Sequence, residues 1–254
     1  MLEIENLRAG YDRAERLHGV SARFRPGTLT AIIGPNGCGK TTLLKCAAGL
    51  LKPWSGEIRL DGENYARMEP REVARRAAYM PQSRVAPGIS VRRLAEHGRY
   101  PYLRFGHDLS AEDRRIVSEA LRRAGMEDKS ASAVSRLSGG ERQRAYIAMM
   151  LAQEAKLLLL DEPTTYLDPA AQFMVMELLS ALAREGRAVA AVLHDLPLAM
   201  RYADRMLLMR GGEIALDGTP EELFRSGLLD EVFGIRARKI DDETFVFTKK
   251  EDSE

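Results

Sequence analysis

The chain has 254 residues, near the upper size for a single hydrophobic core, so we expect one compact domain with a subdomain. Apolar residues make up 45% and charged residues 30%, which is typical of a water-soluble globular protein. The formal net charge is only +1, whereas nucleic-acid-binding proteins usually carry a surplus of positive charge. We therefore expect no nucleic acid among the partners.

The N-terminal part of the chain predicts strands followed by a helix. Residues 1–33 have the pattern of short strands, and residues 29–33 form an apolar run that ends at Gly34, as a buried strand does. Residues 41–51 predict a helix that Pro53 would end. Both elements flank a glycine-rich segment, which makes that segment a strand-to-helix loop.

The remainder of the chain predicts a helical insertion and then a parallel sheet. Residues 83–150 have charged residues at helical spacing, so we expect a mainly helical insertion there. Residues 156–160 and 187–193 are apolar runs on either side of a predicted helix over 169–184, a rhythm typical of parallel strands. Residues 207–217 predict a hairpin that turns at two glycines.

The cysteines and the apolar runs bear on the compartment. If residues 40–51 are helical, Cys38 and Cys46 lie about 10 Å apart, too far for a disulfide, so we expect a reducing, cytosolic compartment. Residues 1–10 lack the apolar stretch of a signal peptide. No apolar run approaches the roughly 20 residues that span a bilayer, so a membrane role would depend on a partner.

Residues 34–41, GPNGCGKT, fit the phosphate-binding pattern GxxxxGK[ST] between a predicted strand and a predicted helix. Glycines let backbone N–H groups surround an anion, and the helix N-terminus adds partial positive charge. Lys40 would reach the β- and γ-phosphates, and the Thr41 hydroxyl would bind Mg²⁺. The alternative is a glycine-rich turn. The candidate nucleotide-binding residues here are Asn36, Gly37, Cys38, Gly39, Lys40, Thr41 and Thr42.

Cys38 lies among these N–H groups, where a thiol can have a lowered pKa and become reactive. We expect instead that it is a small residue filling a free position of the loop. Cys46, on the following helix, is expected to be a small buried hydrophobic residue.

Two acidic residues follow the apolar run LLLL at residues 157–160. A buried strand would deliver Asp161 to the carboxyl edge of the sheet, where open α/β sheets bind ligands. Asp161 would help to hold Mg²⁺, and Glu162 would orient or deprotonate the attacking water, a role typically worth about 10²–10⁴ in rate. The alternative is that two acids merely end a strand.

The segment LSGGERQ at residues 137–143 precedes a predicted helix, so the N–H groups of Ser138, Gly139 and Gly140 form a second candidate anion site. In isolation it would indicate a helix cap. Between a phosphate loop and LLLLDEP, however, it resembles the LSGGQ signature of the ATP-binding-cassette (ABC) family, with Glu in the fifth place.

The resemblance covers about residues 2–220 and implies further site residues. Gln82 matches the glutamine that senses Mg²⁺ and connects the site to the transport partner, and Asp168 matches the loop that crosses to the other subunit. His194 matches the histidine facing the γ-phosphate, and Tyr11 matches the aromatic residue stacked on adenine. Packing roles remain the alternative for the last two. The implied catalytic residues are Lys40, Gln82, Glu162 and His194, and the implied metal ligands are Thr41, Gln82 and Asp161.

The resemblance also implies an α/β fold with a P-loop NTPase core around a parallel sheet, an N-terminal antiparallel β subdomain and a helical insertion subdomain. It implies a single ATPase domain over residues 1–240, with the insertion at about 83–155. Residues 241–254 are expected to form a C-terminal strand and a frayed tail.

Within the family, the segment TTYLD at residues 164–168 resembles the iron–siderophore importer branch, and so does GRYPY at residues 98–102. Haem and cobalamin importers are alternatives, and a soluble ATPase acting on nucleic acid or ribosomes is an alternative of another class. Tyr100, Tyr102 and Phe105 alternate with Arg99 and Arg104, which favours a partner-facing groove over a packed interhelical corner.

The resemblance implies a mechanism and a set of partners. ATP and Mg²⁺ are the expected cofactors, held between the phosphate loop of one chain and the signature of another in a head-to-tail homodimer. Hydrolysis would open the dimer and drive integral-membrane permease subunits, which in turn receive cargo from a substrate-binding protein. The expected location is the cytoplasmic face of the inner membrane of a bacterium or archaeon.

Overall fold

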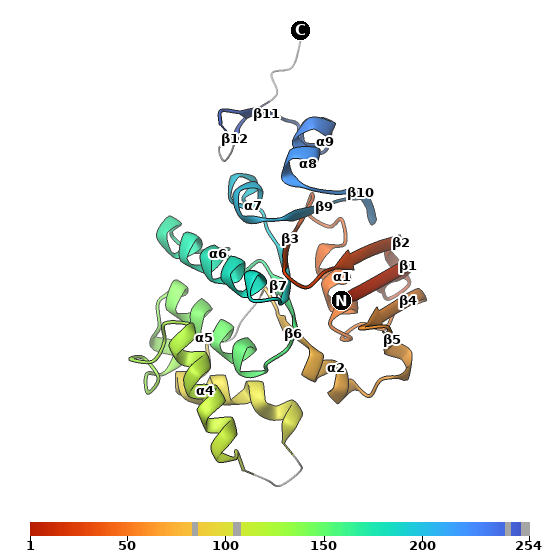
Figure 1. Ribbon diagram of the computed structural model, residues 1–254. Coiled ribbons are helices and arrows are strands. Elements are labelled where there is room, and N and C mark those ends of the chain that lie inside the picture. The colour runs from red at the N-terminus through yellow and green to blue at the C-terminus, as the bar shows by residue number, and fades with distance from the viewer. Residues whose placement is uncertain (83–85, 104–107, 242–244, 250–254) are drawn as a thin grey trace.

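The computed structural model describes residues 1–82, 86–103, 108–241 and 245–249. Two larger sheets lie side by side, helices pack around them, and a small hairpin follows near the C-terminal end (Figure 1). This arrangement confirms the predicted α/β class with a parallel sheet, an antiparallel sheet and surrounding helices.

The antiparallel sheet has the strand order β2-β1-β4-β5. Its strands are β1 (Leu2–Tyr11), β2 (Ala14–Phe24), β4 (Ser55–Leu60) and β5 (Glu63–Asn64). In β1, buried Leu2 and Ile4 alternate with the more accessible Glu3 and Glu5, so one face of the sheet packs on the core. The strand pattern predicted for residues 1–33 is thereby confirmed.

The central sheet has the strand order β10-β9-β3-β8-β7-β6. Its strands are β3 (Thr28–Ile33), β6 (Ala77–Met80), β7 (Leu157–Asp161), β8 (Ala188–Val192), β9 (Arg205–Arg210) and β10 (Glu213–Gly218). Neighbours from β9 to β6 pair in parallel, and β10 pairs with β9 antiparallel, which confirms the predicted hairpin.

Strands β7 and β8 are buried along their whole length because both faces of the central sheet are covered. Leu158 and Leu160 belong to the core cluster under the helical side, whereas Leu157 and Leu159 belong to the cluster under the antiparallel sheet. A strand covered on both faces has no solvent-facing residues, which explains why its sequence is a continuous apolar run.

Helices cover the two faces of the central sheet. Helix α1 (Lys40–Ala47) packs on the side of the antiparallel sheet, and α6 (Pro169–Arg184) packs on the opposite side. The predicted helix over residues 41–51 is thus too long. It ends at Ala47, and Gly49 follows with a left-handed φ of 71°, which a continuing helix does not allow.

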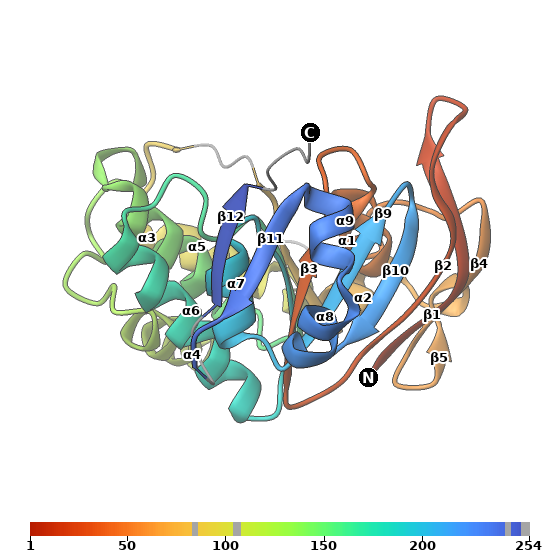
Figure 2. The ribbon, with the colours of Figure 1, turned by 90° about the horizontal axis from the view of Figure 1, so that it is seen from above.

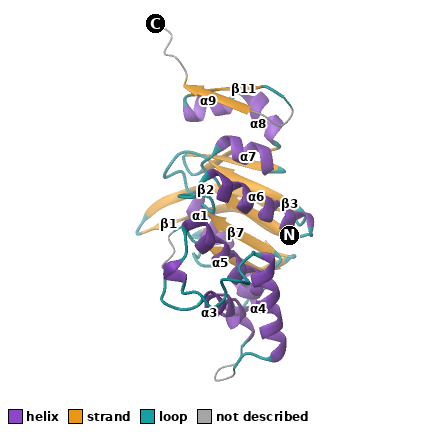
Figure 3. Ribbon diagram, turned by 90° about the vertical axis from the view of Figure 1, so that its left-hand side faces the viewer, coloured by secondary structure: helices purple, strands orange, loops and turns teal. Residues whose placement is uncertain are grey.

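The segment between β6 and β7 is mainly helical and lies at one end of the molecule (Figure 3). Its helices are α3 (Val91–Glu96), α4 (Ala111–Arg123) and α5 (Gly139–Ala152), with 3₁₀ turns at His97–Tyr102 and Val134–Arg136. The preceding helix α2 (Pro70–Arg76) and strand β6 were not predicted. Strand β6 has only four residues, so its pairing with β7 decides its conformation.

Arg99 and Tyr102 do not form the partner-facing groove that the sequence favoured. Arg99 is 5% exposed, and its guanidinium pairs with Asp113 at 2.8 Å and with Glu154 at 2.8 Å. The Tyr102 ring lies 4.1 Å from that guanidinium, and its hydroxyl donates to the Gln153 carbonyl. These side chains form a packed interhelical corner. Tyr100 is 51% exposed and does not belong to this corner, and Arg104 and Phe105 lie outside the described residues.

Helix α7 (Leu196–Tyr202) precedes β9. Helices α8 (Pro220–Ser226) and α9 (Leu228–Phe233) follow β10 and lead to strands β11 (Ile235–Lys239) and β12 (Phe245–Lys249). Figure 2 shows β11 and β12 as a separate hairpin beside α7. Phe245 of β12 packs on Phe224 of α8, with ring centroids 5.4 Å apart. Of the tail predicted to fray, residues 249–254, Lys249 instead belongs to β12, and residues 250–254 lie outside the described residues.

Candidate nucleotide-binding site

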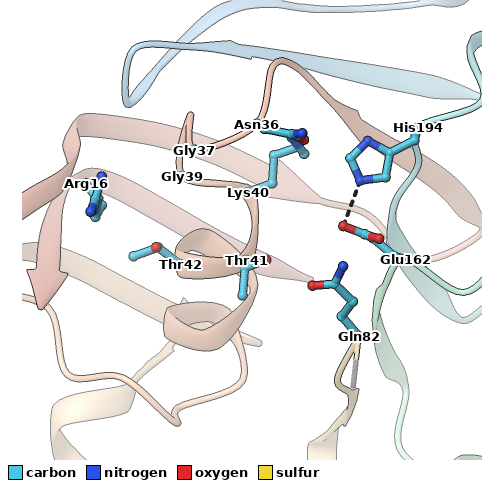
Figure 4. A pocket seen from close by; sticks show the side chains of 10 residues that line it. All are labelled: Arg16, Asn36, Gly37, Gly39, Lys40, Thr41, Thr42, Gln82, Glu162 and His194. Atoms are coloured by element: carbon cyan, nitrogen blue, oxygen red, sulfur yellow. Dashed lines mark hydrogen bonds and ion pairs between the residues drawn. The ribbon is translucent and has the colours of Figure 1, made fainter. Parts of the chain in front are cut away.

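An open pocket of 640 Å³ lies at the carboxyl edge of the central sheet (Figure 4). Strands β3, β8 and β7 are neighbours there, and the chain enters the pocket directly after each of them. Parallel strands deliver their carboxyl ends to one edge, which is why residues distant in sequence meet. The pocket is lined by Arg16, Asn36, Gly37, Gly39, Lys40, Thr41, Thr42, Gln82, Glu162 and His194.

The glycine-rich loop has a conformation that requires glycine at two positions. Gly39 has a φ of 104°, and a Cβ there would lie 2.8 Å from the Arg16 carbonyl oxygen. A Cβ on Gly34 would lie 2.2 Å from the Met209 carbonyl oxygen. Helix α1 starts after Gly39 with no side chain capping its N-terminus. Its first N–H groups are therefore left to an anion.

Lys40 supplies a cation directly beside those N–H groups. Its side chain is 7% exposed, and its ammonium donates to the carbonyls of Gly34 at 2.7 Å and Pro35 at 2.9 Å. A buried ammonium is costly unless it is hydrogen-bonded, and these carbonyls hold it within the loop. The position fits the predicted contact with phosphate oxygens.

Both cysteines are free and buried. Burial raises the pKa of the Cys38 thiol, and neighbouring Lys40 offsets only part of that effect. Burial raises the pKa of Cys46 to about 12. Cys38 thus packs as a small core residue and contributes its backbone to the loop, which agrees with the expectation of an unreactive thiol.

Asp161, the last residue of β7, has the surroundings of a cation ligand. It is 1% exposed, and its Oδ1 is buried without a hydrogen-bond partner among the described residues. Its Oδ2 accepts from the Tyr79 hydroxyl at 3.4 Å. Burial raises the pKa of Asp161, and the Thr41 hydroxyl partly offsets this. An unpaired buried carboxylate oxygen beside a hydroxyl fits Mg²⁺, which prefers such oxygen ligands.

Both carboxylate oxygens of Glu162 are held in place. Oε1 lies 2.7 Å from His194 Nε2, and Oε2 accepts from the Thr165 hydroxyl at 3.0 Å. Glu162 has a left-handed φ of 53°, an uncommon conformation for this residue type that occurs often at functional sites. Figure 4 shows Glu162 and His194 joined, with Gln82 across from them. Sequence reasoning missed Thr165, whose hydroxyl reaches Glu162, three residues earlier, in the local turn after β7.

Tyr11 and Arg16 lie in the hairpin next to the pocket. Tyr11 is 39% exposed, and Lys45 Nζ lies 5.5 Å from its ring centroid. Arg16, rather than Tyr11, is among the residues that line the pocket. The sequence analysis missed Arg16, since a lone arginine near a strand start carries no signal. Tyr11 borders the site beside α1, and its stacking on adenine stays a prediction.

The signature residues Ser138, Gly139 and Gly140 lie at the start of α5, away from this pocket. Ser138 caps the helix, and its side chain and that of Glu141 bond reciprocally to each other's backbone N–H groups. A second pocket of 310 Å³ is lined by Gln82, Gly139, Arg142, Gln143, Thr165, Tyr166 and Leu167. Within one chain, the structure therefore does not bring the signature into the pocket that contains Lys40.

The predicted crossing loop lies between Glu162 and α6. Asp168 caps α6, accepting from the Ala171 N–H at 2.9 Å. Tyr166 is 94% exposed and has a left-handed φ of 64°. The loop therefore presents an aromatic side chain to the outside, next to the signature glycines.

No helix in the described part of the chain combines the length and the apolar character needed to cross a bilayer.

Comparison with known proteins places these features in one family. The family model of ABC transporters matches residues 17–165, more than half of the chain. The ferric enterobactin transport ATP-binding protein FepC of Escherichia coli is 43% identical over 240 residues, covering 94% of this chain and 89% of FepC. The hemin import ATP-binding protein HmuV of Streptomyces coelicolor is 43% identical over 218 residues, covering 85% of this chain and 77% of HmuV.

Solved structures agree with the sequence matches. A nucleotide-free ATP-binding cassette from an ABC transporter has a TM-score of 0.83 at 23% identity, covering 92% of this chain and 97% of that one. A dimeric ATP-binding cassette in a post-hydrolysis state, bound to ADP and Pi, has a TM-score of 0.75 at 27% identity, covering 87% and 99%. The chain therefore belongs to the ABC transporter family, as an ATP-binding subunit, which confirms the family that the motifs predicted.

Proposed function

We propose that the chain is the ATP-hydrolysing subunit of an importer for iron chelates of the siderophore type. The observation that carries hydrolysis is Glu162, which directly follows strand β7 and lines the pocket beside the phosphate loop, with its two oxygens held by His194 and Thr165. The cargo class rests on relatives such as FepC, whose name refers to ferric enterobactin.

In this proposal each residue of the pocket has a separate task. Lys40 and the N–H groups of the loop bind the β- and γ-phosphates. Glu162 accepts a proton from the attacking water, whose oxygen bonds to the γ-phosphorus while the bond to the bridging oxygen of ADP breaks. His194 orients Glu162 and faces the γ-phosphate, and Gln82 lies opposite to sense the ligand.

Mg²⁺ fits the residues present. Thr41 and Asp161 would hold it, with Gln82 nearby, because the buried Asp161 Oδ1 lacks a protein partner among the described residues. When bound, Mg²⁺ neutralises charge on the phosphate oxygens. The protein's part is to position the carboxylate and the hydroxyl.

We further propose that the working unit is a head-to-tail homodimer. The support is the separation within one chain of the signature from the pocket that holds Lys40. Closure would place Ser138, Gly139 and Gly140 of one chain, together with the loop that ends at Asp168, on the ATP of the other. Opening after hydrolysis would drive integral-membrane permease subunits supplied by a substrate-binding protein, with this chain peripheral on the cytoplasmic face.

A crosslink between different chains tests the shared site. One preparation carries Asn36→Cys and another carries Ser138→Cys, both with Glu162→Gln to retain ATP; both positions are exposed, whereas the native thiols are buried. A short bifunctional maleimide should give a covalent dimer in the mixture with ATP, and little in either preparation alone. If a chain carrying both thiols crosslinks only within itself, the shared site is wrong.

The cargo is tested by uptake in a strain that lacks the gene, supplied with several iron chelates and with haem. Restored uptake of an iron chelate by the wild-type gene supports the proposal. Haem is the second candidate, because HmuV is named for hemin import. Co-purification with nucleic acid or ribosomes instead of membrane subunits would contradict both.

A further inference from the structure

Lys129 lies beside the signature, outside every motif that the sequence analysis identified. Its Nζ is 3.1 Å from Glu141 Oε1, and its side chain is 51% exposed. The other oxygen of Glu141, Oε2, accepts from the Ser138 N–H at 3.0 Å. One carboxylate thus connects the start of α5 to a lysine from the loop after α4.

Glu141 carries a negative charge at the start of α5, where the proposed shared site would bind the phosphates of ATP. The N–H of Ser138 and the ammonium of Lys129 hold the pKa of the Glu141 carboxyl below its usual value. Its negative charge therefore competes with phosphate for the N-terminal end of α5. The N–H groups of Gly139 and Gly140, in the first helical turn, have no intrahelical acceptor and stay available to a ligand.

A count of charges shows what Lys129 changes. A helix N-terminus acts as roughly +0.5 elementary charge, so with the carboxylate alone the local sum is about −0.5. Adding the ammonium of Lys129 returns the sum to about +0.5. Lys129 therefore cancels the charge of Glu141, while Arg142, which lines the same pocket as Gly139, adds a positive charge of its own.

We propose that Lys129 is a positioning residue for the signature: it neutralises and holds Glu141, so that the start of α5 attracts the phosphates of an ATP bound to a second chain. The inference rests on the proposed shared site. Lys129 acts through Glu141 and need not touch the nucleotide.

The alternative is that Lys129 and Glu141 form an ordinary surface ion pair, and this alternative makes a different prediction. Exposed pairs contribute little to stability and nothing to a ligand elsewhere. The chain offers a matched control in Arg122, which pairs with Glu119 on the exposed face of α4 in the same helical segment.

The experiment measures ATP-driven dimerisation of Glu162→Gln chains by sedimentation, together with KM and kcat for ATP in chains with native Glu162. Lys129→Ala should raise the ATP concentration for half-maximal dimerisation and the KM about three- to tenfold, the range of charge effects at helix ends. The change should shrink at high salt. Lys129→Arg and Arg122→Ala should both show the wild-type ATP dependence of dimerisation and the wild-type KM. None of these substitutions should shift the unfolding midpoint.

The decisive variant is Lys129→Ala combined with Glu141→Gln. The amide introduced by Glu141→Gln can still cap the helix but carries no charge. The double variant should therefore show the wild-type ATP dependence of dimerisation. Normal dimerisation by Lys129→Ala alone, or no restoration by Glu141→Gln, would overturn the inference while leaving the shared site intact. A Glu162→Gln chain that never dimerises with ATP would overturn the shared site itself, and the inference with it.

Discussion

Two helices of this chain begin with glycine-rich segments, yet their N-termini are built differently. Helix α1 follows a central strand, starts without a side-chain cap, and has the buried cation Lys40 in its first turn. Helix α5 follows the 3₁₀ turn Val134–Arg136, and Ser138 and Glu141 cap it reciprocally. The first start holds the groups of the predicted phosphate site within one chain. At the second, the Glu141 carboxylate already accepts from the Ser138 N–H, and the start of the helix is exposed.

The difference shows that glycines before a helix do not by themselves make a phosphate site. The N–H groups of α1 are open because the backbone of Gly39 approaches Arg16 too closely for any side chain to cap them. At α5, in the proposed dimer, Lys129 neutralises Glu141 and a second chain brings the nucleotide. Substitutions at the first site should therefore have larger effects.

The largest effect is expected at Glu162. Glu162→Gln removes the proton acceptor and should lower ATP hydrolysis at least ~10²-fold while ATP still binds. Thr165→Val leaves the carboxylate but removes the hydroxyl that holds Oε2, so its rate should fall less. Steady-state phosphate release measures both. Hydrolysis by Glu162→Gln near the wild-type rate would remove Glu162 from the mechanism.

The next effect concerns Lys40 at the start of α1. Lys40→Ala removes a charge-assisted contact worth about 1.5–3 kcal/mol, so ATP affinity should fall roughly ten- to a hundredfold. Lys52→Ala is the matched control, since Lys52 is exposed beyond the end of the same helix. Calorimetric titration gives both affinities, and equal values for the two variants would contradict the phosphate-loop interpretation.

A smaller loss of ATP affinity is expected at Tyr11, and triphosphate binding should distinguish its role from that of Arg16. Tyr11→Ala removes only ring stacking, so ATP affinity should fall about three- to tenfold while inorganic triphosphate binds as before. Arg16→Ala removes a cation from the pocket wall and should weaken triphosphate as well. Competition titrations distinguish these outcomes. A parallel loss of both ligands in Tyr11→Ala would show that Tyr11 is structural.

The smallest effect is expected at Cys38, whose side chain packs into the core and not into the pocket. Cys38→Ala should leave ATP affinity within about twofold and cost about 1 kcal/mol of unfolding free energy. Because burial raises the thiol pKa, a disulfide reagent should label the native chain slowly at pH 7 and faster at alkaline pH. Rapid labelling at neutral pH would contradict this account.

Local patterns determined much of the fold and part of the candidate site. The apolar runs of β7 and β8 predicted buried parallel strands, because a strand covered on both faces needs no polar residues. Helix α6 begins and ends where its pattern predicted, at Pro169 and Arg184. The loop before Lys40 and the acids Asp161 and Glu162 at the end of β7 were identified from spacing, and their roles stay predictions.

The remainder was decided by contacts between distant segments. Strand β6 is too short for its sequence pattern to predict a strand, and its conformation follows from pairing with β7. Arg99 resembled a surface residue until Asp113 and Glu154 enclosed it. Lys129 meets Glu141 only because the fold brings the loop after α4 to the start of α5. A sequence pattern reports whether a residue faces water or the core, but it does not report which distant side chain lies opposite.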